Sequence, residues 1–114
     1  MKPEERDAAY VWDMLSAARL ASELLAGVSR EAYLRERMRQ LALERALELA
    51  GEAARRVSEA FQSAHPQVDW RRIVGQRNVL AHEYGAIDQE RLYRTGKESV
   101  PGLIKVLEKI LERL

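Results

Sequence analysis

The sequence predicts an all-α protein, folded as a single antiparallel bundle of about four to five helices across residues 1–114. Apolar residues recur at intervals of three and four along most of the chain, which is the period of an amphipathic helix. No segment shows the alternation and turn residues typical of strands and hairpins. A chain of 114 residues supports one hydrophobic core of ordinary size, so a second domain is not expected.

The first half of the chain predicts two helical segments. The first runs from about Asp7 to Leu25 and ends at Gly27. Ser29 can cap the second, which continues to about Ala64, with a break or short turn allowed near residues 33–37. The dipeptide His65-Pro66 ends it, because a residue before proline avoids the helical region. The apolar stripes consist of Tyr10, Met14, Ala17, Ala21 and Leu24 in the first segment and Leu43, Leu47, Ala50, Ala54, Val57 and Phe61 in the second.

The second half predicts shorter helices. Asp69 is a suitable N-cap for a helix that begins near Trp70 and is stopped by Gly85. Asp88 caps a short helix through Tyr93. A final helix begins at a first-turn proline and carries the residues Pro101, Leu103, Val106, Leu107, Ile110 and Leu114.

Composition and charge limit the kinds of partner. The net charge is only +1, from 19 basic and 18 acidic residues, so affinity for a polyanion must come from a local patch. The sequence contains no cysteine and no apolar run long enough to cross a membrane, and its charged start does not resemble a signal peptide. We therefore expect a cytoplasmic protein with no membrane association. Trp12 and Trp70 are expected in the core or at an interface.

An octet at residues 77–84, RNVLAHEY, is the strongest functional signal. It gathers the cation of Arg77, the amide of Asn78, the imidazole of His82 and the phenol of Tyr84 within about two helical turns. The sequence contains only 2 histidines, so an imidazole in this cluster is a specific observation. These groups together are suited to handling a phosphate.

Helical geometry places the charge of Arg77 on an apolar stripe with Ile73, Leu80 and Tyr84. A guanidinium there requires a carboxylate, a phosphate or a subunit boundary, because an unpaired buried charge costs several kcal/mol. The long preceding helix offers Glu44, Glu48 and Glu52 on consecutive turns, and we expect Glu48 or Glu52 to pair with Arg77.

Arg77 and His82 lie about 140° apart around a regular helix and about 7.5 Å apart along it. The two side chains can contact the same substrate atom in only three ways. The arginine side chain bends around the helix, the helix unwinds near Gly85, or a second copy of the chain completes the site. The third arrangement also accounts for a charge on an apolar stripe. We therefore expect a homodimer whose interface includes this helix.

An RNA phosphate at this site gives each side chain a chemical role. The imidazole of His82 can take the proton of a ribose 2′-hydroxyl, and Arg77 can stabilise the charge that develops on the phosphorus oxygens. Asn78 can orient either group, and Tyr84 can bind a phosphate oxygen or stack on a base. A purely structural alternative makes Arg77 an internal ion pair, His82 a helix cap and Tyr84 a packed side chain.

The sequence offers little support for a metal site, a nucleotide-binding loop or a serine nucleophile. Two distant histidines without cysteine provide too few zinc ligands, and a carboxylate metal site on Glu44, Glu48 and Glu52 lacks a matching cluster. No phosphate-binding loop, dinucleotide fingerprint or serine triad is present. No metal and no cofactor are predicted. Arg71 and Arg72 form either a solvated face or a patch that faces RNA.

The chain resembles the HepT-like branch of the HEPN domains over nearly its whole length. The family's pattern is an arginine, four to six intervening residues, a histidine, one residue and a tyrosine. Arg77, His82 and Tyr84 match it at the four-residue spacing, and Asn78 occupies the usual position of an asparagine. The stretch 47–58 resembles the central helix of the family. The remaining matching positions are Trp70, Ile73, Gly75, Ile87, Asp88, Val100 and Pro101.

The resemblance implies a homodimeric, metal-independent endoribonuclease that acts as the toxin of a toxin-antitoxin pair. It also implies a minimal nucleotidyltransferase antitoxin that transfers AMP to the motif tyrosine, here Tyr84. A bulky anionic nucleotide two residues from His82 would block the site and repel RNA. The alternatives are a catalytically silent subunit that binds or positions substrate for the nucleotidyltransferase and a nucleotide-binding sensor.

Overall fold

The computed structural model describes residues 3–83, 85 and 87–114, and within these residues the chain is helical and contains no strand. This confirms the predicted all-α class. Among the described helices, none is both long and apolar enough to cross a bilayer. The elements in order are α1 (Pro3–Leu25), α2 (Arg30–Arg35), α3 (Arg37–Arg56), α4 (Glu59–Ala64), α5 (Trp70–His82), α6 (Gln89–Arg94), η1 (Thr95–Ser99) and α7 (Val100–Glu112).

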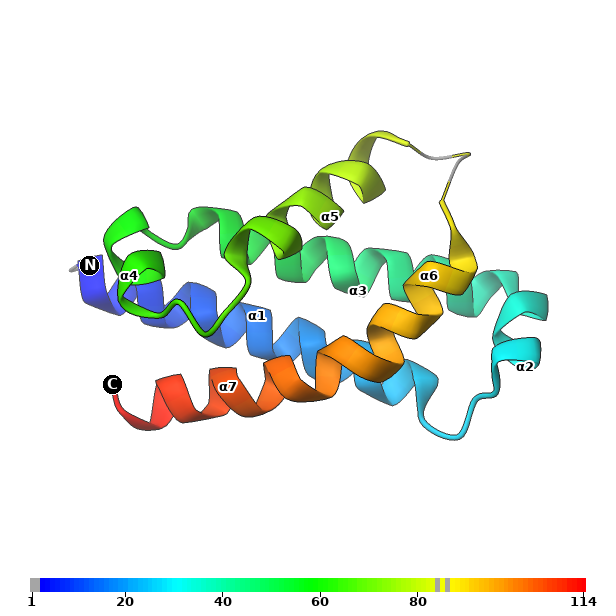
Figure 1. Ribbon diagram of the computed structural model, residues 1–114, viewed down its shortest axis with the longest axis horizontal. Coiled ribbons are helices and arrows are strands. Elements are labelled where there is room, and N and C mark those ends of the chain that lie inside the picture. Colours follow the sequence, from blue (N-terminus) through cyan, green and yellow to red (C-terminus); the bar gives the residue numbers. More distant parts are fainter. Residues whose placement is uncertain (1–2, 84, 86) are drawn as a thin grey trace.

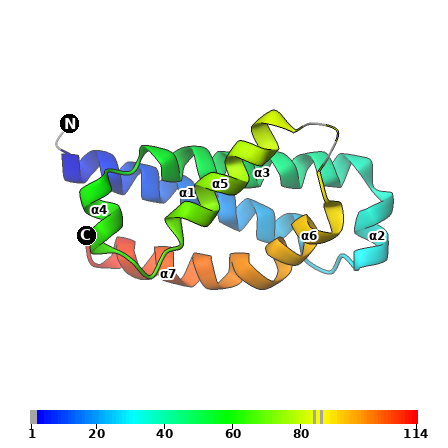
Figure 2. The ribbon, with the colours of Figure 1, turned by 45° about the horizontal axis from the view of Figure 1, so that its top comes forward.

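The long helices α1, α3 and α7 run along the length of the molecule, and α5 crosses α3 obliquely on the outside (Figures 1 and 2). Helix α1 packs against both α3 and α7, while α5 packs chiefly on α3. The short helices α2 and α4 lie at opposite ends of the bundle (Figure 1). Helix α5 is thus held mainly from one side.

Two clusters of buried side chains form the core. One surrounds Met14, Trp70 and Leu107 and joins α1, α5 and α7 near α4. The other surrounds Tyr33 and Leu92 at the opposite end, where α2 and α6 meet α1 and α3. Leu80 belongs to this second cluster, so the two ends of α5 are anchored in different parts of the core.

The segment expected to continue to about Ala64 is broken twice, and only the second break contradicts the prediction. One break, at Glu36, falls in the predicted range of 33–37. The other, at Val57 and Ser58, was not predicted. The buried carboxylate of Asp7 on α1 accepts hydrogen bonds from the Ser58 amide at 2.8 Å and from its hydroxyl at 2.7 Å, and the same hydroxyl caps α4. A distant contact therefore redirects the chain.

Two helix starts also differ from expectation. Helix α1 begins at Pro3 rather than near Asp7. The final helix does not begin afresh at Pro101, because α6 passes without interruption through the π-turn η1 into α7. Gly96 in this turn packs against Leu25, and an added Cβ there would collide with the leucine side chain.

The two tryptophans lie in different environments. Trp70 is buried and donates its indole hydrogen bond to the carbonyl of His65 at 2.9 Å. Trp12 is 52% exposed and lies under the guanidinium of Arg19, which is 5.7 Å from the ring centroid. A core position for Trp12 is therefore wrong, and its alternative position at an interface stays a prediction.

Candidate functional site

Helix α5 carries most of the predicted site residues and is regular from Trp70 to His82. Asp69 caps it as predicted, accepting a hydrogen bond from the Arg72 amide at 3.3 Å. Buried Trp70 and Leu80 anchor its two ends. The helix ends at His82, before the expected stop at Gly85, and Tyr84 lies outside the described residues.

Gly51 allows α5 to approach α3 very closely. A Cβ added at Gly51 would overlap Cβ of Arg77 and would lie 2.9 Å from the carbonyl oxygen of Ile73. Only a residue without a side chain fits between the two backbones. This crossing point brings Arg77 next to the C-terminal half of α3.

The guanidinium of Arg77 is held by two oxygens. Its Nε lies 2.9 Å from Oε2 of Glu52, and its Nη1 donates a hydrogen bond to Oδ1 of Asn78 at 3.0 Å. The Nε hydrogen does not point at the carboxylate, so this contact is an ion pair rather than an aligned hydrogen bond. The side chain of Arg77 is only 21% exposed. Of the two expected partners, Arg77 takes Glu52, and Glu48 instead pairs with Arg45 at 3.2 Å.

Glu52 also binds Arg55 and Arg56, the next basic residues of α3. Its Oε1 accepts a hydrogen bond from Arg55 at 3.0 Å and lies 3.2 Å from Arg56. The hydrogen bond from Arg55, followed by the charges of Arg55, Arg77 and Arg56, lowers the pKa of the Glu52 carboxyl, against an opposing effect of burial. The single carboxylate of Glu52 thus faces three guanidinium groups. These four side chains together carry a net positive charge.

Sequence reasoning missed the contribution of Arg55 and Arg56 to this site. They stand three and four residues after Glu52, the spacing that brings helical side chains together. That spacing was a usable signal once Glu52 was a candidate partner of Arg77.

His82 and Asn78 are both exposed on α5. Because the helix stays regular between Arg77 and His82, the helix does not unwind to bring them together. The arginine side chain turns toward Glu52 of α3, while His82 sits in the last helical turn. Within one chain, the two side chains leave the helix in directions about 140° apart.

Arg71 and Arg72 are both exposed at the start of α5. Arg72 lines a groove between α5 and the α6–η1 segment, and its Nη2 lies 3.5 Å from the hydroxyl of Ser99. Across the described part of the chain, no group of three or more histidine, aspartate or glutamate side chains is arranged to hold a metal ion.

Comparison with known proteins identifies the family. The profile described as Ribonuclease HepT-like matches residues 14–110. The chain belongs to the HepT-like ribonuclease family. The predicted resemblance and the predicted enzyme class are thereby confirmed at the level of the family.

Relatives that are named as ribonucleases match the chain almost from end to end. The "Putative RNase MJ1380" of Methanocaldococcus jannaschii is 35% identical over 100 residues, which cover 88% of this chain and 92% of that protein. The "Probable ribonuclease HepT" of Thermococcus cleftensis is 34% identical over 110 residues, which cover 96% and 98%. The "Putative RNase TTE0752" of Caldanaerobacter subterraneus is 29% identical over 104 residues, which cover 91% and 93%. No solved structure matches the chain.

Proposed function

We propose that this chain is a metal-independent endoribonuclease whose catalytic residues are Arg77 and His82. The observation that carries the proposal is a preorganised guanidinium, held by Glu52 and Asn78, on the same regular helix as an exposed imidazole. Nε faces Glu52 and Nη1 donates to Asn78. The remaining N–H groups of the guanidinium can still bind a phosphate. A guanidinium that is already oriented stabilises developing charge without further ordering.

The reaction is transesterification within the RNA chain. The ribose 2′-oxygen attacks the adjacent phosphorus, the bond from phosphorus to the 5′-oxygen breaks, and the products are a 2′,3′-cyclic phosphate and a 5′-hydroxyl. The imidazole of His82 takes the proton of the 2′-hydroxyl, and an imidazolium returns a proton to the leaving 5′-oxygen. Arg77 stabilises the negative charge on the phosphorus oxygens in the transition state.

The site is completed by a second copy of the chain. The angle of about 140° between Arg77 and His82 separates them within one protomer, and a two-fold axis near α5 would bring the arginine of one protomer to the histidine of the other. A groove of about 390 Å³ between α1 and α3 is lined by both apolar and polar side chains, Glu52 among them. Leu20 and Leu49, which line it, are 44% and 40% exposed, and exposed apolar patches of this kind are typical of protein interfaces.

The proposal extends to a toxin-antitoxin pair in the cytoplasm, in which residues 1–114 form one toxin domain. A nucleotidyltransferase antitoxin would transfer AMP from ATP to Tyr84, releasing pyrophosphate. Tyr84 lies outside the described residues, and its neighbours Glu83 and Gly85 are exposed. An added nucleotide two residues from His82 would place negative charge where the RNA phosphate must bind.

Incubation of RNA with purified wild-type protein, Arg77→Ala and His82→Ala tests the proposal. The wild type, isolated without an antitoxin, is expected to cleave RNA in the presence of a chelator and to leave 2′,3′-cyclic phosphate ends. Each variant is expected to lose at least 100-fold in rate, on the order expected for loss of an acid–base or charge-stabilising group. Equal cleavage by all three proteins, or none by the wild type, would favour a catalytically silent subunit instead.

A further inference from the structure

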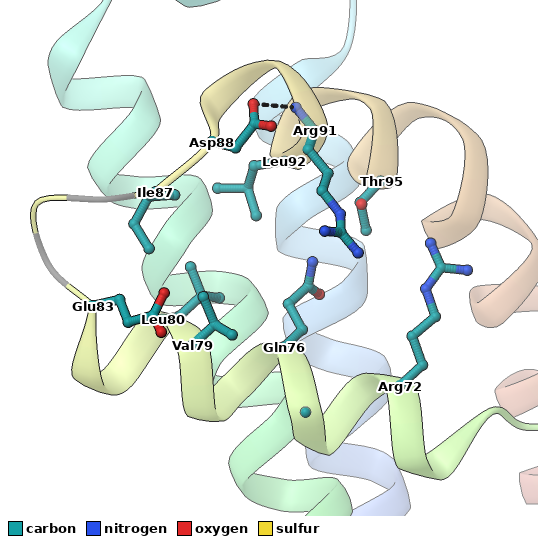
Figure 3. Close-up of a pocket in the computed structure, with 11 residues that line it drawn as sticks. Arg72, Gln76, Val79, Leu80, Glu83, Ile87, Asp88, Arg91, Leu92 and Thr95 are labelled. Atoms are coloured by element: carbon teal, nitrogen blue, oxygen red, sulfur yellow. Dashed lines mark hydrogen bonds between the residues drawn. The ribbon is translucent and has the colours of Figure 1, made fainter.

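Another pocket lies beside α5, and Arg77 does not line it. It has a volume of about 460 Å³ and separates α5 from the α6–η1 segment. Figure 3 shows side chains from both segments pointing into this space. We call it the α5–α6 groove. Nothing in the proposed chemistry of Arg77 and His82 uses it.

The two ends of the α5–α6 groove differ in character. Near the loop that follows α5, the apolar side chains Leu80, Ile87 and Leu92 line it. At the other end, Arg72 of α5 and Arg91 of α6 extend into the space, and Gln76 lies beside Arg91 (Figure 3). The groove thus combines an apolar slot with a cationic end.

A smaller hollow of about 180 Å³ continues the cationic end. Arg72, Arg91 and Thr95 line both spaces, and Arg94 and Ser99 join them here. The hollow therefore gathers guanidinium groups from two segments around the hydroxyl groups of Thr95 and Ser99. Both kinds of group donate hydrogen bonds to phosphate oxygens.

Most other arginines of the described residues form an ion pair, and these three do not. Among the ion pairs of the described residues, none includes Arg72, Arg91 or Arg94. The carboxylate of Asp88 is engaged as a helix cap by the Arg91 amide at 3.1 Å. Like charges brought together repel one another, and a bound anion would reduce that cost.

Acidic side chains line the groove as well, and their positions determine which end of the groove favours a phosphate. Glu83 and Asp88 lie at the loop end, away from Arg72 (Figure 3), and Glu98 lines the smaller hollow. The carboxylates at the loop end would repel a phosphate there. A phosphate is therefore favoured beside Arg72 and Arg91, and an uncharged planar base is favoured in the apolar slot.

We propose that the α5–α6 groove binds a nucleotide of the RNA substrate outside the scissile bond. The phosphate lies on Arg72 and Arg91, with Arg94 nearby, and the base lies against Leu80 and its apolar neighbours. This inference rests on the proposed ribonuclease function. Arg72 precedes His82 by ten residues, about 15 Å along the helix, so the groove can hold RNA that extends away from the cleaved phosphate.

Binding of a fluorescent oligoribonucleotide with 2′-O-methyl riboses, which cannot be cleaved by 2′-oxygen attack, tests the proposal. The variant is Arg72→Ala/Arg91→Ala. The matched control is Arg6→Ala/Arg35→Ala, which removes the same charge from exposed arginines of α1 and α2 that form no ion pair among the described residues. Circular dichroism and thermal unfolding confirm that both variants are folded.

The groove variant is expected to bind at least tenfold more weakly than wild type, with a salt dependence of log K reduced by about 0.7, the value for one lost phosphate contact on a single strand. The control is expected to lose less than threefold. With cleavable RNA, the groove variant is expected to raise KM and to leave kcat within a few-fold. Equal weakening in both variants, or no binding by the wild type, would overturn the proposal.

The same experiment separates this inference from the proposed catalytic roles. His82→Ala is expected to bind the uncleavable RNA as the wild type does. If wild type cleaves RNA and the groove variant binds normally, the groove proposal fails and the catalytic proposal stands. If the groove variant loses binding while His82→Ala cleaves normally, the catalytic role of His82 fails and the groove stands.

Discussion

Nε of Arg77 on α5 lies 2.9 Å from Oε2 of Glu52 on α3, one residue from the point where Gly51 brings the two helices together. Through this contact, the positive charge of Arg77, which lies on an apolar stripe of α5, is paired with a carboxylate. It also aligns the arginine before any substrate binds. The packing of two helices and the geometry of the candidate site therefore depend on the same few atoms.

Substitution of Gly51 by alanine is expected to destabilise the protein by about 1–3 kcal/mol, the usual range for overpacking a close contact. The added methyl group would displace Arg77 and the backbone of Ile73, so RNA cleavage is expected to fall as well. Denaturant unfolding measures the change. Gly102→Ala is the control, because a Cβ there meets nothing within 4 Å and alanine favours a helix. Equal stability of the two variants would contradict the close approach of α3 and α5.

Glu52→Gln is expected to reduce stability at pH 7 by roughly 0.5–1 kcal/mol, because an uncharged amide cannot pair with the surrounding arginines. The pKa of Glu52 is lowered in the folded protein, so its contribution is complete above the unfolded carboxyl pKa of about 4.3. It is lost as the pH falls through the lower folded value. The stability difference between wild type and Glu52→Gln is therefore expected to shrink below about pH 4.

Urea unfolding between pH 3 and pH 7 measures this difference. Glu48→Gln is the matched control, since Glu48 is similarly exposed and pairs with Arg45 of its own helix instead of joining α5. A stability difference for Glu52→Gln that does not depend on pH would argue against the ion pair as its source.

Mixing of Arg77→Ala with His82→Ala tests whether the site is shared between protomers. If each site takes its arginine from one chain and its histidine from the other, half of the dimers in an equal mixture are mixed, and each of these has one intact site. Activity is then expected to recover to roughly a quarter of wild type. A mixture as inactive as its components, in a protein shown to exchange subunits, would place both residues of each site in one chain.

Tyr33→Phe is expected to destabilise the protein by about 1–2 kcal/mol at pH 7, because a buried hydrogen-bonding partner is lost. The hydroxyl of Tyr33 donates to Oε1 of Gln89 at 2.5 Å, and Nε2 of Gln89 donates to Glu44 at 2.7 Å. This network ties α6 to α2 and α3, just after the loop that follows His82. Tyr10→Phe, at a half-buried tyrosine of α1, is the control.

The effect of Tyr33→Phe is also expected to depend on pH. Burial, reinforced by the charge of Glu44, raises the pKa of Tyr33 well above its usual range. The unfolded phenol ionises near pH 10 while the folded one stays neutral, so the advantage of wild type over Tyr33→Phe is expected to fall as the pH rises above about 10. Unfolding curves at pH 8, 10 and 11 measure this, and a constant difference would contradict burial of the hydroxyl.

The sequence by itself determined the features that depend on neighbouring residues. Helix class, the caps at Ser29, Asp69 and Asp88 and the turn at Gly27, whose φ is +70°, follow from local conformational preferences and short hydrogen bonds. The candidate residues Arg77 and His82 were also visible, because the motif lies within two turns of one helix.

Only the tertiary structure decided the features that join distant segments. The break at Ser58 depends on Asp7 of another helix. Glu48 and Glu52 lie one turn apart on α3. Because α3 and α5 cross at Gly51, Arg77 forms its ion pair with Glu52. Arg72 and Arg91 share a groove because the fold places the α6–η1 segment opposite α5 across it. Such choices depend on where helices cross, and crossing points are set by packing of side chains far apart in sequence.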